Sequence, residues 1–66
     1  MQNYRIVVSG RLCGTLAEMF DGLQIRCSGP DTELRGAISD QAQLFGHLLR
    51  LRDLGVNLIS VNPVAS

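Results

Sequence analysis

Sixty-six residues allow a single domain, residues 1–66, because a chain of this length removes only roughly 60% of its unfolded surface from water on folding. The composition, 45% apolar, is that of a globular chain, but so small a core supplies only about 3–5 kcal/mol, which favours self-association. Six arginines balance six acidic residues, so neither a nucleic-acid-binding surface nor a tail for polyanions is expected.

The N-terminal segment carries no targeting signal that we can identify. Met1–Tyr4 has no basic residue, and the first apolar run, Ile6–Val8, is too short for a signal peptide or a membrane span. We therefore expect a cytoplasmic protein with no membrane contact. Cys13 and Cys27 form no CxxC or Cys/His cluster, so in a reducing compartment we expect two free thiols that act as small buried hydrophobes.

The first two predicted elements are a strand and a short helix. Tyr4–Ser9 is rich in β-branched residues and alternates so that Tyr4, Ile6 and Val8 share one side. Thr15 and Glu18 have the spacing of a capping box, which predicts a helix of five or six residues after the Gly10–Gly14 loop. Its inward face is expected to carry Leu16, Met19 and Phe20.

A hairpin is predicted next. Leu23–Ser28 alternates apolar and polar residues, Gly29–Asp31 has the chemistry of a turn, and Thr32–Ile38 resumes the alternation with Leu34 and Ile38 inward. On the outward side, Arg26 is expected to face either Glu33 or Arg35, depending on the register.

The longest helix is predicted after Ser39 or Asp40, either of which can cap it, and Gly55 ends it. Its inward arc is expected to carry Ala42, Leu44, Phe45, Leu48, Leu49 and Leu51. Val56–Val61 then reads as a strand, in which either Leu58 or Ile59 can point inward. Pro63 should prevent its continuation unless the strand lies at a sheet edge.

The order of these elements predicts an α+β fold of the ferredoxin-like type, a β-α-β-β-α-β two-layer sandwich. Right-handed crossovers would place both helices on one face of a four-stranded antiparallel sheet. The other face should then be open, with a largely polar set of side chains: Arg5, Val7, Ser9, Gln24, Arg26, Glu33, Arg35 and Ala37. We expect five of these, Arg5, Val7, Arg26, Glu33 and Arg35, to form the surface that meets a partner or a second copy.

Three stretches resemble small stand-alone proteins of high-GC Gram-positive bacteria that have no assigned function. They are Tyr4–Leu12, Phe20–Leu23 and Asp40–Gly55. The resemblance spans most of the chain and implies no activity.

The loop after the first strand is the candidate ligand site. Heavy-metal-associated domains share the expected topology and hold metal there with a CxxC motif, but Leu16 stands where the second cysteine would be needed, so no metal site is expected. ACT-type domains use a glycine in the same loop to bind an amino acid. Gly10, Arg11, Cys13 and Gly14 fit that picture loosely, and Arg11 is suited to a carboxylate, although a tight solvated loop explains the same residues.

No catalytic residue can be assigned from the sequence. His47 has no orienting carboxylate at a suitable spacing, and Arg52 falls within the apolar arc of its helix, where it must pair, snorkel or meet another subunit. Base stacking on the open sheet would need aromatic residues there, whereas Tyr4, Phe20 and Phe45 are all expected inward, so no nucleic-acid partner is predicted.

Two hypotheses for function remain. The first is a structural or interaction module, homo-oligomeric and without catalytic activity or cofactor of its own. The alternative is an ACT-like small-molecule-binding domain, or a minor isomerase or cyclase, that uses the Gly10–Gly14 loop.

Overall fold

The computed structural model describes residues 2–64; Met1, Ala65 and Ser66, which the predicted domain included, lie outside the described residues. The described residues have an α+β architecture with six elements in the order strand, helix, strand, strand, helix, strand. They are β1 (Gln2–Ser9), α1 (Cys13–Met19), β2 (Gln24–Ser28), β3 (Asp31–Ile38), α2 (Gln41–Asp53) and β4 (Leu58–Val64).

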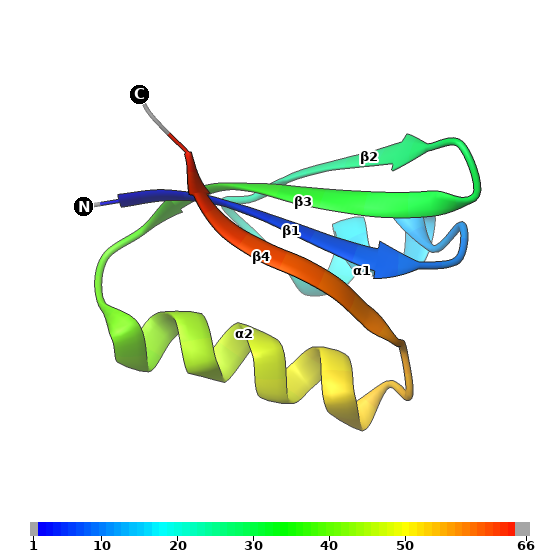
Figure 1. Cartoon of the computed structure of the whole chain (residues 1–66). Helices are drawn as coiled ribbons and strands as arrows, with labels where there is room; N and C mark the ends of the chain where they lie inside the picture. Colours follow the sequence, from blue (N-terminus) through cyan, green and yellow to red (C-terminus); the bar gives the residue numbers. More distant parts are fainter. Residues whose placement is uncertain (1, 65–66) are drawn as a thin grey trace.

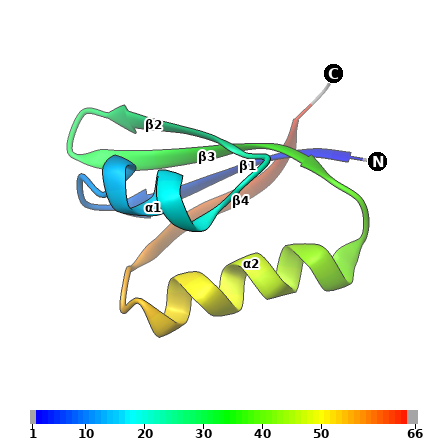
Figure 2. The same ribbon diagram turned by 180° about the vertical axis from the view of Figure 1, so that it is seen from behind.

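The four strands form one sheet with the order β2-β3-β1-β4, and every neighbouring pair is antiparallel. β3 and β1 occupy the centre, while β2 and β4 are the edges (Figure 1). Both helices lie on the same face of this sheet, and among residues 2–64 no element covers the opposite face (Figures 1 and 2). We refer to that opposite face as the outer face.

The alternation of the central strands determines which side chains reach the core. Ile6 of β1 lies opposite Leu34 of β3, and both side chains are buried together with Val8 and Ile38. Leu16 and Phe20 cover these strands from α1 and the residue that follows it, and Leu44 and Leu51 cover them from α2. The predicted inward positions of β1 and β3 are therefore confirmed.

The two helices begin in different ways. Asp40 caps α2 by accepting a hydrogen bond from the Gln43 amide at 2.9 Å, and the Gln43 side chain accepts one from the Ser39 amide at 2.7 Å. This reciprocal pair confirms the predicted start of α2. The capping box predicted at Thr15 and Glu18 is wrong, because α1 already begins at Cys13 and has no side-chain cap.

The prediction that α2 buries a broad apolar arc is only partly right. Leu44 and Leu51 are buried, but Phe45 and Leu49 are about half exposed, at 55% and 51%, and Ala42 is also exposed. The reason is geometric: a sheet of four strands covers a narrow strip of a single helix, and the flank of α2 beyond that strip has no neighbour to pack against.

β4 begins two residues later than predicted, at Leu58, and continues through Pro63 to Val64. Proline is tolerated because β4 is an edge strand. The register with β1 shifts at Val7 and Val8, so that Leu58 lies opposite Val8 and Ile59 is the extra residue of an irregularity. Leu58 therefore takes the inward register position that the sequence left undecided.

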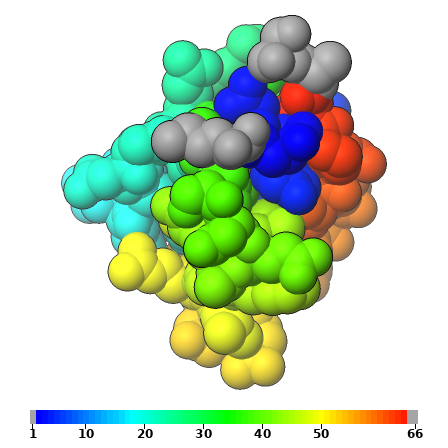
Figure 3. Space-filling model, turned by 90° about the vertical axis from the view of Figure 1, so that its left-hand side faces the viewer, coloured from blue at the N-terminus to red at the C-terminus, as the bar shows by residue number. Residues whose placement is uncertain are grey.

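The view from the end at which β1 begins shows how the edges flank α2. In Figure 3, α2 (green to yellow) lies below the sheet, with α1 (cyan) on one side and β4 (orange to red) on the other. The flank of α2 that faces away from α1 is thus on the β4 side.

Candidate functional site

Side chains on the outer face are arranged in rows that run across the strands. One row, in sheet order, contains Gln24, Arg35, Arg5 and Asn62. The neighbouring row contains Arg26, Glu33, Val7 and Ser60. The structure thus brings together all five residues predicted for a partner surface, and the register pairs Arg26 with Glu33 rather than with Arg35.

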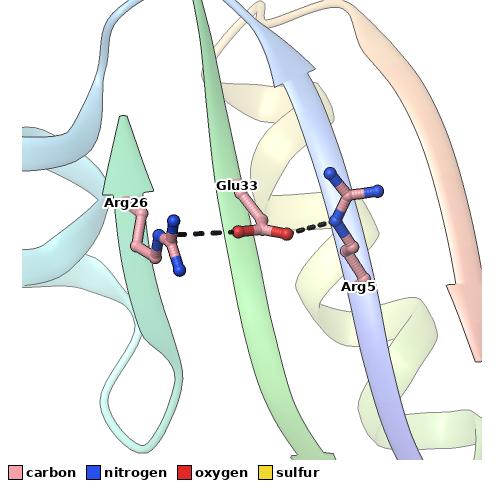
Figure 4. A network of polar contacts seen from close by, with 3 residues as sticks. All are labelled: Arg5, Arg26 and Glu33. Carbon is pink, nitrogen blue, oxygen red and sulfur yellow. Dashed lines mark hydrogen bonds and ion pairs between the residues drawn. The ribbon is translucent and has the colours of Figure 1, made fainter. Parts of the chain in front are cut away.

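Glu33 lies at the centre of this face. Its side chain lies between Arg5 of β1 and Arg26 of β2; it accepts a hydrogen bond from Arg5 Nε, and its other oxygen lies 3.8 Å from Arg26 Nε (Figure 4). Although it is on the uncovered face, Glu33 is only 6% exposed, because the two arginine side chains cover it. Sequence alternation placed Glu33 on this face correctly but gave no sign of its burial.

The hydrogen bond from Arg5 lowers the pKa of the Glu33 carboxyl below its usual value, against the opposing effect of burial. The charges of Arg5, Arg26 and Arg35 lower this pKa further. Glu33 is therefore an anion at neutral pH and neutralises part of the positive charge of the outer face.

A shallow depression of about 290 Å³ lies beside Arg35. Its lining residues come from the start of β1, the turn before β2, the first residue of β2, and β3: Asn3, Gly22, Gln24, Arg35 and Gly36. None of them is acidic, and within residues 2–64 the Arg35 side chain forms neither an ion pair nor a hydrogen bond. From the sequence, Gln24 and Arg35 were both expected on the open face, and of this group Arg35 alone was predicted for the partner surface.

The loop predicted as a ligand site is occupied by contacts with the β2–β3 turn. The Gly10 amide donates to the Pro30 carbonyl at 3.1 Å, and Arg11 donates to the Gly29 carbonyl at 3.2 Å. The Thr32 hydroxyl donates to the Gly10 carbonyl at 2.6 Å and accepts from the Leu12 amide at 2.8 Å.

These bonds engage the groups that a bound carboxylate would need. Arg11 is already directed at a backbone carbonyl, and the helix that follows has only seven residues. Thr32, which is fully buried, makes two of the four bonds that hold this loop in place. Its role was missed because nothing in its sequence neighbourhood distinguishes it from any other strand threonine.

The prediction of two free thiols is wrong, because Cys13 and Cys27 are joined by a disulfide. Cys13 begins α1, and Cys27 lies on the inward side of β2, with a Cα–Cα distance of 5.6 Å. A spacing of fourteen residues gives no hint of this contact, which depends on α1 folding back against β2. Cys13 is thus bonded to β2, while Gly14 remains exposed beside it.

His47 is a boundary residue of α2. Its ring meets that of Phe20 edge to face, with centroids 5.4 Å apart, and burial lowers the pKa of His47, assisted by the charge of Arg50. Arg50 itself donates to the Met19 carbonyl at 3.0 Å and so ties α2 to α1. Within residues 2–64 no cluster of three or more metal-ligating side chains occurs.

The second candidate surface is apolar. On α2, Phe45 and Leu49 are one turn apart on the flank opposite His47; because His47 faces Phe20, this flank is on the β4 side. On β4, Leu58 and Ile59 are 48% and 53% exposed. We call these four residues the α2–β4 surface. Arg52, on the same flank of α2, is exposed and lies 3.8 Å from Asp53.

The profile of a domain family, described as a domain of unknown function (DUF8691), matches residues 3–62. The chain belongs to this family. No curated protein and no solved structure matches it.

The match to DUF8691 covers both candidate surfaces, since Arg5 through Ile59 all lie within the matched range. The disulfide and the Arg5–Glu33–Arg26 network also fall within the DUF8691 domain. Among the described helices of this DUF8691 chain, none is long and apolar enough to cross a bilayer.

Proposed function

We propose that this chain is a small interaction module that forms a homodimer through the α2–β4 surface and has no catalytic activity of its own. The observation that carries the proposal is the half-exposed set Phe45 and Leu49 on α2 and Leu58 and Ile59 on the edge strand β4, in a chain of 66 residues. Four half-exposed large apolar side chains, two on a helix flank and two on the edge strand that lies on the same side, are typical of a protein interface.

We further propose that the fold is ferredoxin-like. Counted from the β4 edge, the sheet runs β4-β1-β3-β2, with each helix connecting two parallel strands that have one antiparallel strand between them. Two interlocked right-handed crossovers produce this order and place both helices on one face, as Figures 1 and 2 show them.

A second copy of the chain is the occupant that the surface fits best. A two-fold interface requires a patch that is complementary to itself. The α2–β4 surface is uncharged, and beside it Arg52 and Asp53 carry opposite charges, with side chains about three-quarters exposed. Across a two-fold axis Arg52 of one copy can meet Asp53 of the other. The zero net charge of the chain also leaves no overall repulsion between copies.

Association should occur through side chains rather than by extension of the sheet. β4 is an edge strand, but it contains an irregularity at Ile59 and a proline at position 63. Bulges and prolines are the devices by which edge strands avoid pairing with another strand. We therefore expect α2 and the β4 side chains of two copies to pack together without a continuous sheet.

The outer face is a weaker candidate for this interface than its sequence suggested. Its central charge, Glu33, is already paired with Arg5 and Arg26 of the same chain. Docking a second copy there would bring two arginine-rich faces together, which is unfavourable for like charges. The apolar side chains on the β4 side gain about 1.5–3 kcal/mol for each one that passes from full exposure to full burial, and half-exposed ones gain part of this.

The test is the molecular mass in solution by light scattering. We expect wild-type protein at twice the 7.2 kDa chain mass and the double variant F45Q/L49Q at the chain mass. M19Q/L54Q is the matched control, since Met19 and Leu54 are also exposed, at 37% and 40%, but are not among the four residues of this surface. It should remain dimeric.

A monomeric wild type at every concentration would refute the proposal. So would a dimer that survives F45Q/L49Q. In that case the charge-reversal variant R5E/R26E/R35E decides whether the outer face holds the copies together instead. Because Phe45 and Leu49 contribute little to the core, F45Q/L49Q should fold, and its circular dichroism spectrum verifies this.

The cytoplasmic location that the sequence predicts has a consequence for the two cysteines. Disulfides persist in oxidising compartments and are rare in the cytosol. A cytoplasmic chain would therefore hold Cys13 and Cys27 reduced for much of the time, and the disulfide in the structure would be its oxidised state. Trapping of thiols with an alkylating reagent in intact cells distinguishes the two states.

A further inference from the structure

We propose that the depression beside Arg35 is a binding site for an oxyanion, a carboxylate or phosphate group carried by a small molecule. The site is separate from the Gly10–Gly14 loop and from the α2–β4 surface. It is independent of dimer formation, because its polar residues Asn3, Gln24 and Arg35 lie on the outer face.

The row that contains Arg35 is unusual in its charge. Across the sheet it reads Gln24, Arg35, Arg5 and Asn62, with no acidic residue in four positions. Arg35 and Arg5 are direct partners in the β1–β3 ladder, an arrangement of like charges that destabilises a sheet. A bound anion between or beside the two guanidinium groups would remove this repulsion.

Glu33 forms neither an ion pair nor a hydrogen bond with Arg35. Its two oxygens are directed at Arg5 and Arg26, one on each side (Figure 4). The other acid on this side of β3, Asp31, is at the hairpin end, four residues away along the strand, or about 13 Å. Arg35 is therefore the arginine of this face that has no ionic partner among the described residues.

The lining of the depression suits an anion. Besides the Arg35 guanidinium it offers the side-chain amides of Asn3 and Gln24, both of which can donate, and it contains no carboxylate. A guanidinium binds a carboxylate or a phosphate with two parallel hydrogen bonds, which gives both affinity and orientation. At about 290 Å³ the depression is at the lower limit of small-molecule pockets, so the bound group is small.

The experiment is a titration followed by backbone amide NMR, with inorganic phosphate and acetate as separate probes and chloride at matched ionic strength as the reference. We expect the amide signals of Gln24 and Gly36 to shift saturably with phosphate, with acetate, or with both. Saturation by phosphate alone identifies a phosphoryl ligand, and saturation by acetate alone identifies a carboxylate ligand. Saturation by both identifies a general oxyanion site.

Arg35→Gln should weaken binding of the active probe roughly tenfold or more, because it removes a charged hydrogen-bond donor. Arg26→Gln is the matched control: it removes an arginine of the same face that lies outside the depression, and binding should change little. Shifts that do not saturate with either probe, or that weaken equally in both variants, would overturn the proposal. Dimer mass is measured for both variants and should not change, so this outcome is independent of the proposed interface.

Discussion

Glu33 should make the stability of the fold depend on pH. Its carboxylate is buried and paired in the folded protein, whereas an unfolded chain would expose it to water. Arg5 lowers the pKa of Glu33 in the folded protein below the ordinary value of 4.5. A lowered native pKa means that the pair stabilises the fold fully above about pH 4.5 and that this contribution is lost as the pH falls through the native pKa. We expect Glu33→Gln to lower the free energy of unfolding at neutral pH by about 1–2 kcal/mol, a modest value because both arginines are partly exposed.

Urea denaturation from neutral to acidic pH tests this. The difference between wild type and Glu33→Gln should shrink as the pH falls below 4.5. Glu18→Gln, which changes an exposed acid on α1, is the control and should show little difference at any pH. A gap between wild type and Glu33→Gln that stayed constant down to strongly acidic pH would show that the variant acts through packing rather than through charge.

For single residues, the sequence predicted which face of the sheet a strand residue is on, but not which outward residue is buried by its neighbours. The outward alternation of Arg5, Arg26 and Glu33 was correct, yet only the register places two arginines around one carboxylate. Thr32 is a similar case, since its hydroxyl finds Gly10 and Leu12 only after the hairpin folds against the loop. Contacts between residues some twenty positions apart leave no local pattern.

Among the elements, α1 depends most on contacts outside itself. It has seven residues and no side-chain cap, and a helix of that length is unstable alone in water. The disulfide from Cys13 to Cys27 attaches its first turn to β2. By restricting the unfolded chain, a bridge that closes a loop of this size contributes about 3 kcal/mol, comparable to the whole stability of so small a core.

We therefore expect reduction of the disulfide to lower the free energy of unfolding by about that amount, roughly 2–4 kcal/mol. The double variant C13S/C27S should match the reduced wild type, and it should be insensitive to added reductant. Thermal unfolding with and without dithiothreitol measures both effects. If reductant left the wild type unchanged while mass spectrometry confirmed free thiols, α1 would be held by packing of Leu16 and Phe20 alone.

The hydrophobic periodicity of the sequence predicts the elements well but their ends and their burial less well. All six were predicted in the correct order, because alternation and turn residues are local signals. The ends of β4 and the start of α1 were not predicted correctly. Pro63 is permitted in β4 only because β4 is an edge strand, and α1 starts at the cysteine that the disulfide joins to β2. Phe45 and Leu49 obey the helical period but lie beyond the strip that the sheet covers. An apolar arc that is broader than its sheet therefore indicates an interface as readily as a core.

For the whole molecule, the predicted α+β class and antiparallel sheet are confirmed. The proposed partner surface could not be located from the sequence. It depends on which apolar residues are left over once the core is full, and that depends on how wide the sheet is and where α2 lies beneath it. The exposed flank on the β4 side became visible only with the tertiary arrangement.

If two copies share this flank, the thermal stability of the protein must depend on its concentration. Dimerisation stabilises the folded state by mass action, so Tm should rise with protein concentration in wild type and in M19Q/L54Q. In F45Q/L49Q, Tm should be independent of concentration and should coincide with the wild-type value extrapolated to high dilution, because these side chains contribute little to the core of one chain. Scanning calorimetry over a wide concentration range measures this. A wild-type Tm that did not vary would mean that one small core, with its disulfide, is sufficient for the fold and that the apolar flank has another occupant.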